Sequence, residues 1–272
     1  MISLIERTAE NLRLIREKKP LVHNITNFVV MNYSANVLLA MGASPVMAHA
    51  EQEVAQMVSY AGALVLNIGT LSEPWVRSMV KAGQSCGETG TPIVLDPVGS
   101  GATSFRTGTA RKLIDECNVR IVRGNSSEIL SLGTDDATTR GVDSVHHVDD
   151  AAEAACRLAQ EIGSTVAITG PVDLITDGDR VIRVENGDPM MPYVTGTGCS
   201  ATAVIGAFAS VESDPVMAAA GGLAFFGLAG EWAARQAKGP GTFMISLLDA
   251  LYAITPEDII SGCRITEPES RA

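Results

Sequence analysis

The sequence predicts an α/β protein with a mostly parallel central sheet, helices on both faces of the sheet and a helical C-terminal cap. The first observation is alternation, because short runs rich in β-branched residues are separated by stretches with helical periodicity. The second is that several expected strands are apolar throughout, which is typical of parallel strands buried on both faces. The third is composition: 46% of the residues are hydrophobic but only 4% are aromatic, so aliphatic side chains must fill the core.

The expected strands and helices alternate along the first part of the chain. A helix is expected over residues 2–18, where apolar residues recur on a helical period among charges and Pro20 follows. The expected strands lie at 45–48, 63–69, 92–99, 119–125 and 165–170, and the expected helices between them at 51–61, 73–83, 109–117, 126–132 and 151–162. No linker, low-complexity tract or clear repeat interrupts them, so a single domain over residues 1–272 is predicted.

The pattern changes after residue 170. An Asp-Gly turn stands between two alternating segments within 173–186, which predicts a β-hairpin. A glycine-rich turn, VTGTGC, follows at 194–199. No convincing strand comes after it, and the expected helices lie at 200–210, 215–237 and 243–254. The turn therefore introduces a helical cap.

Charge and cysteine usage limit the class of partner and the compartment. The net charge is −11, which argues against nucleic acid and against an anionic membrane surface as partners. The five cysteines are scattered without paired spacing, as is typical of reduced thiols in the cytosol. The N-terminal segment is charged, and the uncharged, glycine-rich stretch 215–230 is shorter than the roughly 20 residues of a membrane helix. We therefore expect a soluble, cytoplasmic protein.

The glycine turn allows more than one interpretation. GTGCSA matches the dinucleotide-binding pattern G-x-G-x-x-A, but that pattern should open a β-α-β unit, and here helix is followed by more helix. A Walker A loop is excluded, because Gly-Lys-Ser/Thr occurs nowhere in the chain. A purely structural turn, with glycines at strained angles and a threonine cap, remains open beside phosphate binding.

Phosphate binding has a physical basis in this turn. Gly196, Thr197 and Gly198 leave room for successive N–H groups to point into one concavity. The helix N-terminus behind them adds about half a positive charge. Cys199 would stand in the first helical turn, where the helix dipole is expected to lower the pKa of its thiol. Transfer of a phosphoryl group to an alcohol fits this arrangement, with Cys199 beside the acceptor as the candidate catalytic residue.

The segment VTGTGCSATAVIGAF resembles the anion-hole segment of the hydroxyethylthiazole kinases, the thiazole branch of the ribokinase-like superfamily. In sugar kinases of that superfamily an aspartate stands at the place of Cys199, so the cysteine marks the thiazole branch. The resemblance covers nearly the whole chain, through LVHNITNFVVMN at 21–32, GASPVM at 42–47, VLDPVG at 94–99 and IVRGNSSE at 121–128. It implies a ribokinase-like fold and ATP-dependent phosphorylation of the hydroxyl of 4-methyl-5-(2-hydroxyethyl)thiazole, a step of thiamine salvage.

The resemblance also implies residues for ATP and Mg²⁺, each of which has a plainer interpretation. Asp96 ends an apolar strand and would lie near the metal and phosphates, although it also suits an ordinary turn. Glu128 would reach the same metal through water, although Asn125 and Glu128 have the spacing of a capping box. Arg123 and Thr169 end two other strands and would bind ATP; without the resemblance, each suits an ion pair or a turn cap equally well.

Three residues are implied on the acceptor side. Met47 would contact the thiazole ring through its sulfur, although a core methionine is the plainer interpretation. Gly196 would serve the substrate as well as the anion hole. Asn27 could face the substrate from a neighbouring subunit, or Asn24 and Asn27 could cap a helix starting near Phe28. The family is trimeric with thiazole sites at subunit interfaces, so a homotrimer is expected.

Three other functional classes remain open at this point. One is another small-alcohol kinase, for pyrimidines or pyridoxal, which Cys199 and Met47 disfavour. The second is a nicotinamide-binding Rossmann protein, which the absence of a strand after the glycine turn disfavours. The third is a binding module without catalysis, in which Asp96, Arg123, Glu128 and Cys199 would share no purpose. The four histidines show no metal-ligand spacing and are expected to be structural or exposed.

Overall fold

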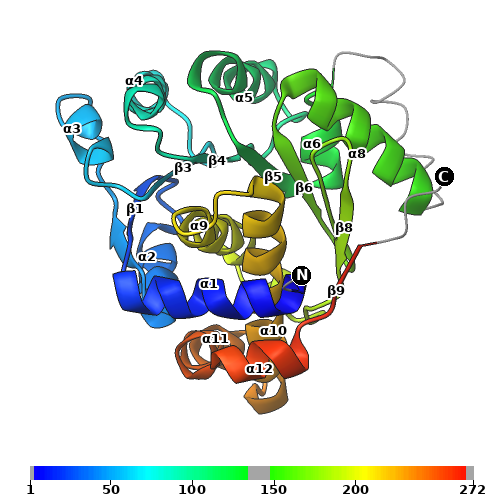
Figure 1. Ribbon diagram of the computed structural model, residues 1–272. Helices are drawn as coiled ribbons and strands as arrows, with labels where there is room; N and C mark the ends of the chain where they lie inside the picture. Colours follow the sequence, from blue (N-terminus) through cyan, green and yellow to red (C-terminus); the bar gives the residue numbers. More distant parts are fainter. Residues whose placement is uncertain (1–2, 134–147, 268–272) are drawn as a thin grey trace.

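A single sheet runs through the middle of the molecule, and helices cover both of its faces (Figure 1). The computed structural model describes residues 3–133 and 148–267. Within those residues the sheet has nine strands in the order β2-β1-β3-β4-β5-β6-β7-β8-β9. They are β1 (Leu21–Ile25), β2 (Ser44–Val46), β3 (Ala63–Asn67), β4 (Ile93–Asp96), β5 (Ile121–Asn125), β6 (Thr165–Thr169), β7 (Asp173–Thr176), β8 (Val181–Val184) and β9 (Ile265–Thr266).

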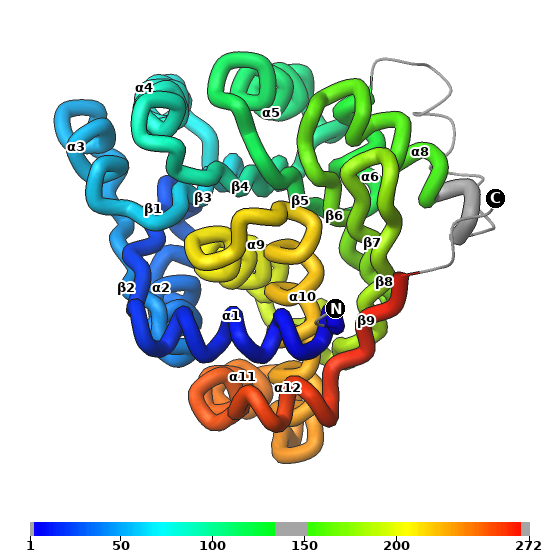
Figure 2. The backbone as a smooth tube through the Cα atoms, in the orientation of Figure 1, coloured from blue at the N-terminus to red at the C-terminus, as the bar shows by residue number. Residues whose placement is uncertain are grey.

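The sheet has a parallel part and an antiparallel part. Strands β1 to β6 pair in parallel, so their carboxyl ends lie along one edge of the sheet. Strands β7 and β8 form the antiparallel hairpin expected after residue 170, and β9 pairs antiparallel with β8. Figure 2 shows β9, near the C-terminus, lying beside β8. The predicted mostly parallel α/β architecture is confirmed.

One face of the sheet is covered by helices that follow the parallel strands. These are α3 (Val54–Val58), α4 (Glu73–Thr89), α5 (Ser104–Cys117), α6 (Ser126–Leu130) and α8 (Val148–Ile162). They pack against strand residues such as Leu64 and Leu66 of β3. Because successive strand residues point to opposite faces, Val65 between them joins the core on the other side.

The other face is covered by helices from both ends of the chain. These are α1 (Leu4–Lys18), α2 (Met31–Met41), α9 (Thr197–Ala209), α10 (Pro215–Gln236), α11 (Pro240–Ala253) and α12 (Pro256–Gly262), with a short 3-10 helix, η1 (Met191–Tyr193), before α9. Helix α10 has the length and apolar composition of a membrane-crossing helix, but 89% of its most apolar window is buried inside the protein. Helix α9 is buried along its length and packs on β1, β3 and β4. The helical cap predicted after the glycine turn is confirmed.

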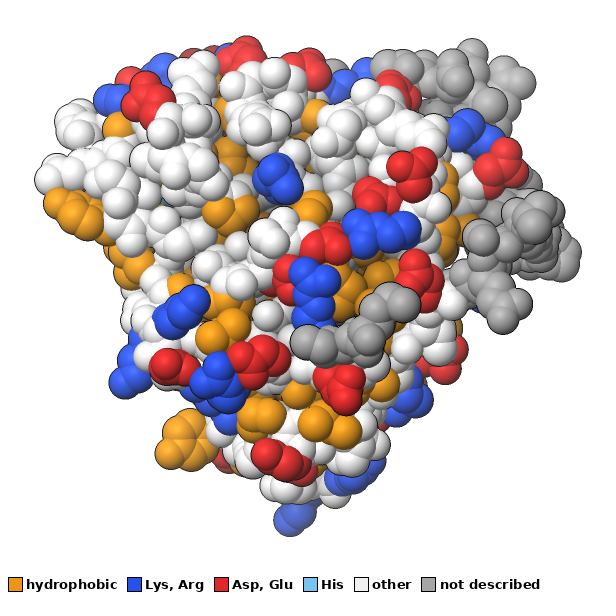
Figure 3. All heavy atoms as spheres, viewed as in Figure 1, with side chains coloured by type: hydrophobic (Ala, Val, Ile, Leu, Met, Phe, Trp, Pro, Cys, Tyr) orange, Lys and Arg blue, Asp and Glu red, His pale blue; other side chains and the backbone are white. Residues whose placement is uncertain are grey.

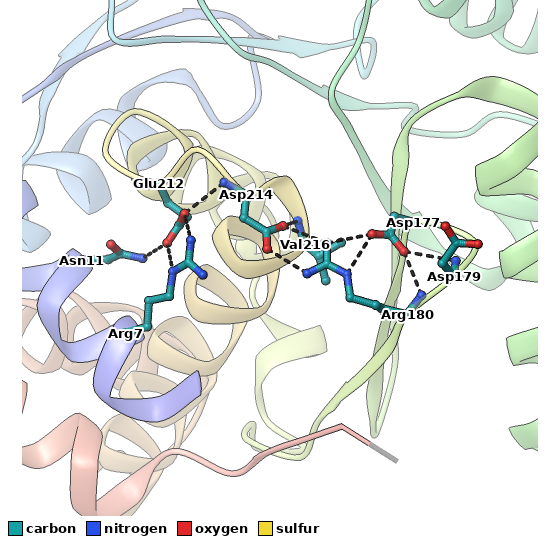
Figure 4. A network of polar contacts seen from close by, with 8 residues as sticks. All are labelled: Arg7, Asn11, Asp177, Asp179, Arg180, Glu212, Asp214 and Val216. Carbon is teal, nitrogen blue, oxygen red and sulfur yellow. Dashed lines mark hydrogen bonds and ion pairs between the residues drawn. The ribbon is translucent and has the colours of Figure 1, made fainter. Parts of the chain in front are cut away.

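A chain of charged side chains ties three segments together away from the carboxyl edge of the sheet (Figure 4). Arg7 of α1 donates two hydrogen bonds to Glu212, in the loop between α9 and α10. Arg180, in the β7–β8 turn, pairs with Asp177 and with Asp214 of the same loop. Figure 3 shows acidic and basic side chains side by side near the middle of this face. The contacts join α1, the α9–α10 loop and the hairpin.

The structure differs from the sequence-based expectations at β1. This strand was not expected, yet it lies inside the sheet between β2 and β3. His23 and Asn24 interrupt its apolar pattern, but both are buried and bond to backbone carbonyls, His23 to Ala48 and Asn24 to Val22. Paired polar side chains can therefore occupy a buried strand that hydrophobic periodicity does not reveal.

Two further differences concern the strand after the glycine turn and the start of helix α2. A strand, β9, does follow the glycine turn, but it has two residues and is held only at the antiparallel end of the sheet. Helix α2 begins at Met31, not near Phe28, and its N-cap residue makes no side-chain bond. The alternative in which Asn24 and Asn27 cap a helix near Phe28 is therefore wrong. Asn24 donates to the Val22 carbonyl, and Asn27 donates to Asn67 while its Oδ1 accepts from the Val29 N–H of the turn before α2.

Candidate active site

Polar side chains line the edge of the sheet where the parallel strands end. Because β1 to β6 are parallel, residues that end different strands become neighbours there, the usual position of ligands in such sheets. The residues at or just after these ends are Asn27 (β1), Met47 (β2), Asn67 (β3), Asp96 (β4) and Thr169 (β6), and Arg123 lies two residues before the end of β5. Five of the six were predicted as site residues from the sequence, and Asn67 was not.

The glycine turn brings the N-terminus of α9 to this edge. Gly196 is the N-cap, with φ +89°, a left-handed conformation that favours glycine, and a Cβ there would lie 2.7 Å from Val30 Cγ1. The Thr197 hydroxyl donates to the carbonyls of Met191 and Val194, so it fixes the turn and does not point at a ligand. The next N–H groups, of Gly198 and Cys199, lie in the first helical turn, where N–H groups have no intrahelical partner. This is the geometry of an anion site.

Asp96 lies buried beneath the turn. Its Oδ2 accepts hydrogen bonds from Asn67 Nδ2 at 2.8 Å and from Thr202 Oγ1 at 2.9 Å. Its Oδ1 has no hydrogen-bond partner among the residues that the structure describes. Burial raises the pKa of Asp96 to about 6, although Arg123 opposes this increase. One carboxylate oxygen is therefore held in place and the other is available.

Cys199 is connected to Asp96 through two asparagines. Asn27 Nδ2 lies 3.5 Å from Cys199 Sγ and donates to Asn67 Oδ1 at 2.8 Å, and Asn67 in turn donates to Asp96. Burial, with the Asp96 carboxylate, raises the pKa of the Cys199 thiol to about 11. The expectation that the helix dipole lowers this pKa is wrong, because the dipole argument omits the burial and the nearby carboxylate.

Arg123 lies between Asp96, Thr169 and the glycine turn. Its Nη2 donates to Thr169 Oγ1 at 2.6 Å, and its Nη1 lies 3.8 Å from Asp96 Oδ2. A Cβ at Gly198 would come within 2.9 Å of Nη1, so only a glycine lets the guanidinium approach the turn this closely. The buried Nε has no partner in the described part of the chain. The guanidinium therefore keeps donors for an anion.

Glu128 and Met47 make none of the hydrogen bonds or ion pairs described above for Asp96, Cys199 and Arg123. Glu128 forms the capping box with Asn125, and its other oxygen accepts from the Gly99 N–H at 2.9 Å. Its charge still raises the pKa of Asp96, so the two carboxylates share one region. Met47 lies just past β2, on the far side of β1 from β3, and is half-buried. The structure thus brings together Asn27, Asp96, Arg123, Thr169 and Cys199.

Two residues of the site were not predicted from the sequence. Asn67 bonds Asn27, Asp96 and the Gly69 N–H, and Thr202 bonds Asp96 from α9. The rule that ligand-binding residues follow apolar parallel strands applies to Asn67 as well as to Asp96 and could have found it. Thr202 is one small residue among many on α9, and only the packing of α9 on β4 reveals its partner.

The structure also decides against the dinucleotide-binding interpretation of the turn. Helix α9 is followed by α10, α11 and α12, and the next strand in the described chain is the short antiparallel β9. A Rossmann unit requires a parallel strand after the helix. The fold of the pyridoxal kinase from Staphylococcus aureus is similar, with a TM-score of 0.61, 16% identity and coverage of 78% of this chain and 88% of that one. This chain and that kinase share a fold.

Comparisons along the whole sequence specify the family. The sequence pattern of the hydroxyethylthiazole kinase family matches residues 12–257. A hydroxyethylthiazole kinase of Desulfotalea psychrophila is 65% identical over 259 residues, 95% of each chain, and one of Desulfosudis oleivorans is 56% identical over 264 residues, 96% of each. The solved hydroxyethylthiazole kinase of Pyrococcus horikoshii OT3 has a TM-score of 0.89 and 46% identity, covering 96% of this chain and 99% of that one. The chain belongs to the hydroxyethylthiazole kinase family.

Proposed function

We propose that the protein transfers the γ-phosphoryl group of ATP to the hydroxyl of 4-methyl-5-(2-hydroxyethyl)thiazole, giving the thiazole phosphate, ADP and a proton. This is a salvage step toward thiamine. The observation that carries the proposal is Cys199 at the glycine-turn N-terminus of α9, beside Asn27 and above Asp96, in a chain that is 65% identical to a relative of that name. The site offers an acceptor position next to an anion position.

The thiol of Cys199 orients the acceptor and does not act as a strong base. With a pKa of about 11, the thiol keeps its proton at neutral pH. Phosphoryl transfer passes through a loose transition state in which the attacking hydroxyl needs little deprotonation at first. The hydroxyl oxygen forms its bond to the γ-phosphorus as the bond to ADP breaks, and its proton leaves afterwards. Catalysis then rests on position and charge.

The anion hole and Arg123 stabilise the transferring group. The N–H groups of Gly198 and Cys199, at the positive end of α9, face developing negative charge on the phosphoryl oxygens. Thr197 contributes by holding the turn through its two carbonyl bonds. Arg123, anchored by Thr169, offers its remaining donors to the ATP phosphates. These interactions need no rearrangement of the turn.

The residues present fit a magnesium ion delivered with ATP. Asp96 Oδ1 is buried and unpartnered among the described residues, and Mg²⁺ takes one or two carboxylates and keeps several waters. Both oxygens of Glu128 already accept backbone N–H groups, which suits contact through water. When bound, Mg²⁺ would neutralise phosphate charge.

The acceptor side and the assembly complete the proposal. Met47 and Gly196 would contact the thiazole, and Asn27 would hold its hydroxyethyl side next to Cys199 of the same chain. We propose a cytoplasmic homotrimer with sites at the subunit interfaces, built from one domain per chain. Exposed apolar side chains near the site, such as Phe28 and Val29, each 65% exposed, favour coverage by another subunit.

One assay tests the reaction directly. Purified protein with ATP and Mg²⁺ should release ADP when hydroxyethylthiazole is added, and the phosphorylated thiazole should appear in equal amount by mass spectrometry. Hydroxymethylpyrimidine is the matched competitor, because it is also a small heteroaromatic alcohol. Faster ADP release with the pyrimidine, or none with the thiazole, would overturn the proposed acceptor.

A further inference from the structure

An aromatic cluster lies next to the acceptor side of the site. Trp75, in the first turn of α4, is 7% exposed and contacts two other rings. The His49 ring stacks on it with centroids 4.2 Å apart and planes 12° apart. The Phe28 ring meets it edge to face, with centroids 4.7 Å apart and planes 63° apart. Each geometry is one that aromatic pairs prefer.

The two rings belong to the two segments that carry the proposed acceptor residues. Phe28 directly follows Asn27, after β1, and His49 stands two residues after Met47, after β2. Neither segment is part of a helix or strand, so side-chain contacts decide its position. Trp75 touches both segments at once. It therefore joins the two segments beyond the ends of the paired strands β1 and β2.

The pairing of β1 with β2 brings the starts of the two segments together, and further bonds hold each segment. His23 holds the Ala48 carbonyl at 2.8 Å from its Nε2, and Thr70 accepts from the Phe28 N–H at 3.1 Å. Farther along α4, Lys81 donates to the Glu51 carbonyl at 2.8 Å. These bonds hold the segments against β1, the β3–α4 loop or α4. Beyond the ends of the paired strands, the stacked and edge contacts of Trp75 join the side chains of the two segments.

We propose that Trp75 is a positioning residue that sets the acceptor site, by holding the Asn27 and Met47 segments at the spacing the thiazole requires. The proposal rests on the acceptor side proposed above. Trp75 has no part in ATP binding, because Arg123 and Thr169 lie on β5 and β6, beyond β3 and β4 from the acceptor strands. The Nε1 of Trp75 is buried without a partner in the described chain, so the ring acts through packing and not through a hydrogen bond.

The test compares Trp75→Ala and Trp75→Phe with Trp232→Ala, which removes the same ring from α10, outside the site. Loss of two aromatic contacts should raise the KM for hydroxyethylthiazole about tenfold in Trp75→Ala, with the KM for ATP changed less than about twofold. Trp75→Phe keeps a ring and should recover most of the thiazole KM. Trp232→Ala should leave both KM values unchanged. A parallel rise of both KM values in Trp75→Ala, or an unchanged thiazole KM, overturns the proposal.

A double-mutant cycle keeps the test decisive if Trp75→Ala folds poorly. His49→Ala removes only the stacked ring, which is exposed, and should raise the thiazole KM by itself. Combined with Trp75→Phe, its effect should be non-additive, because both changes act on one contact. Additive effects would show that His49 acts without Trp75 and would overturn the proposal.

Hydrogen exchange separates failure of this inference from failure of the proposed function. If the wild-type protein does not phosphorylate the thiazole, the function fails, and the structural claim is judged without turnover. Amides of residues 27–30 and 47–50 should then exchange faster in Trp75→Ala than in Trp232→Ala. Equal exchange in the two variants would overturn the role of Trp75.

Discussion

The thiol of Cys199 is a neutral group that lies above the carboxylate of Asp96. Its raised pKa follows from burial and from Asp96 below it, and Asn27 fixes its direction. A protonated thiol can guide a hydroxyl but cannot remove its proton at neutral pH. This difference makes substitutions at residue 199 informative.

Cys199→Ala should lower kcat roughly 10- to 100-fold, near the low end of what a proton-transfer group contributes. Cys199→Asp should remain active, because a carboxylate beside the acceptor can accept its proton. Activity of both variants is measured at saturating ATP, with circular dichroism to confirm folding. If Cys199→Ala equals the wild type while Cys199→Asp is inactive, the thiol only fills space.

Gly198 tests the contact between the turn and Arg123. A Cβ there would stand 2.9 Å from Arg123 Nη1, so Gly198→Ala must displace the guanidinium and Gly198→Val must displace it further. We expect the KM for ATP to rise several-fold for Ala and by more than about tenfold for Val, the loss expected for one charge-assisted hydrogen bond. Gly108→Ala, in α5 where a Cβ meets nothing within 4 Å, is the control. Equal KM values for ATP in Gly198→Ala and Gly108→Ala would show that Arg123 does not bind ATP.

At the scale of single elements, β1 shows what periodicity can and cannot predict. The ends of β4, β5 and β6 were predicted from apolar runs followed by Asp96, Arg123 and Thr169, and the structure places these residues together. Strand β1 was missed because His23 and Asn24 are polar, and their partners come from a distant loop and from their own strand. The end of β3 at Asn67 could have been recognised by the same rule, but its bonds to Asn27 and Asp96 depend on neighbours that only the structure shows.

The contribution of His23, in β1, to the free energy of unfolding depends on pH. Burial lowers the pKa of His23, although its bond to Ala48 opposes the decrease. Between that lowered value and the unfolded value of about 6.5, the unfolded chain binds more protons than the folded chain. The free energy of unfolding contributed by His23 is therefore complete above about pH 6.5 and is lost as the pH falls below it. His23→Gln keeps an N–H donor and should make the urea midpoint less sensitive to pH between about 7.5 and 5, a range that includes the unfolded value of about 6.5. An unchanged slope would contradict the buried neutral state.

At the scale of the whole molecule, Glu212 connects the N-terminal helix to the core. Burial alone would raise the pKa of Glu212, but hydrogen bonds from Arg7, from the Asp214 N–H and from Asn11 lower it below its usual value. Glu212→Gln should lower the free energy of unfolding by roughly 1–2 kcal/mol, the modest figure reflecting the partial exposure of Arg7. Glu10→Gln, on the exposed face of α1, is the matched control. Equal urea midpoints for the two variants would show that the bonds of Glu212 contribute nothing to the free energy of unfolding.

The assembly can be tested with mixtures of defective chains. Asn27 contacts Cys199 of its own chain, so Asn27→Ala and Cys199→Ala chains should not restore activity when refolded together. Met47 lies on the segment that Trp75 joins to the Asn27 segment of the same chain, so the three residues belong to one site. Met47→Ala with Cys199→Ala should likewise remain inactive, in trimers confirmed by light scattering. Recovery in either mixture would show that the site combines these residues from two chains.

The order of strands in the sheet has a consequence for how such an enzyme changes over evolutionary time. The residues proposed for the acceptor follow β1 and β2 at one end of the parallel part, those proposed for ATP lie on β5 and β6 toward the other end, and α9 packs on β1, β3 and β4. Mutations in the loops after β1 and β2 can therefore alter which alcohol is accepted without disturbing the donor. A descendant lineage could acquire a new substrate through a few changes at one end of a sheet, while inheriting the chemistry of the other end intact.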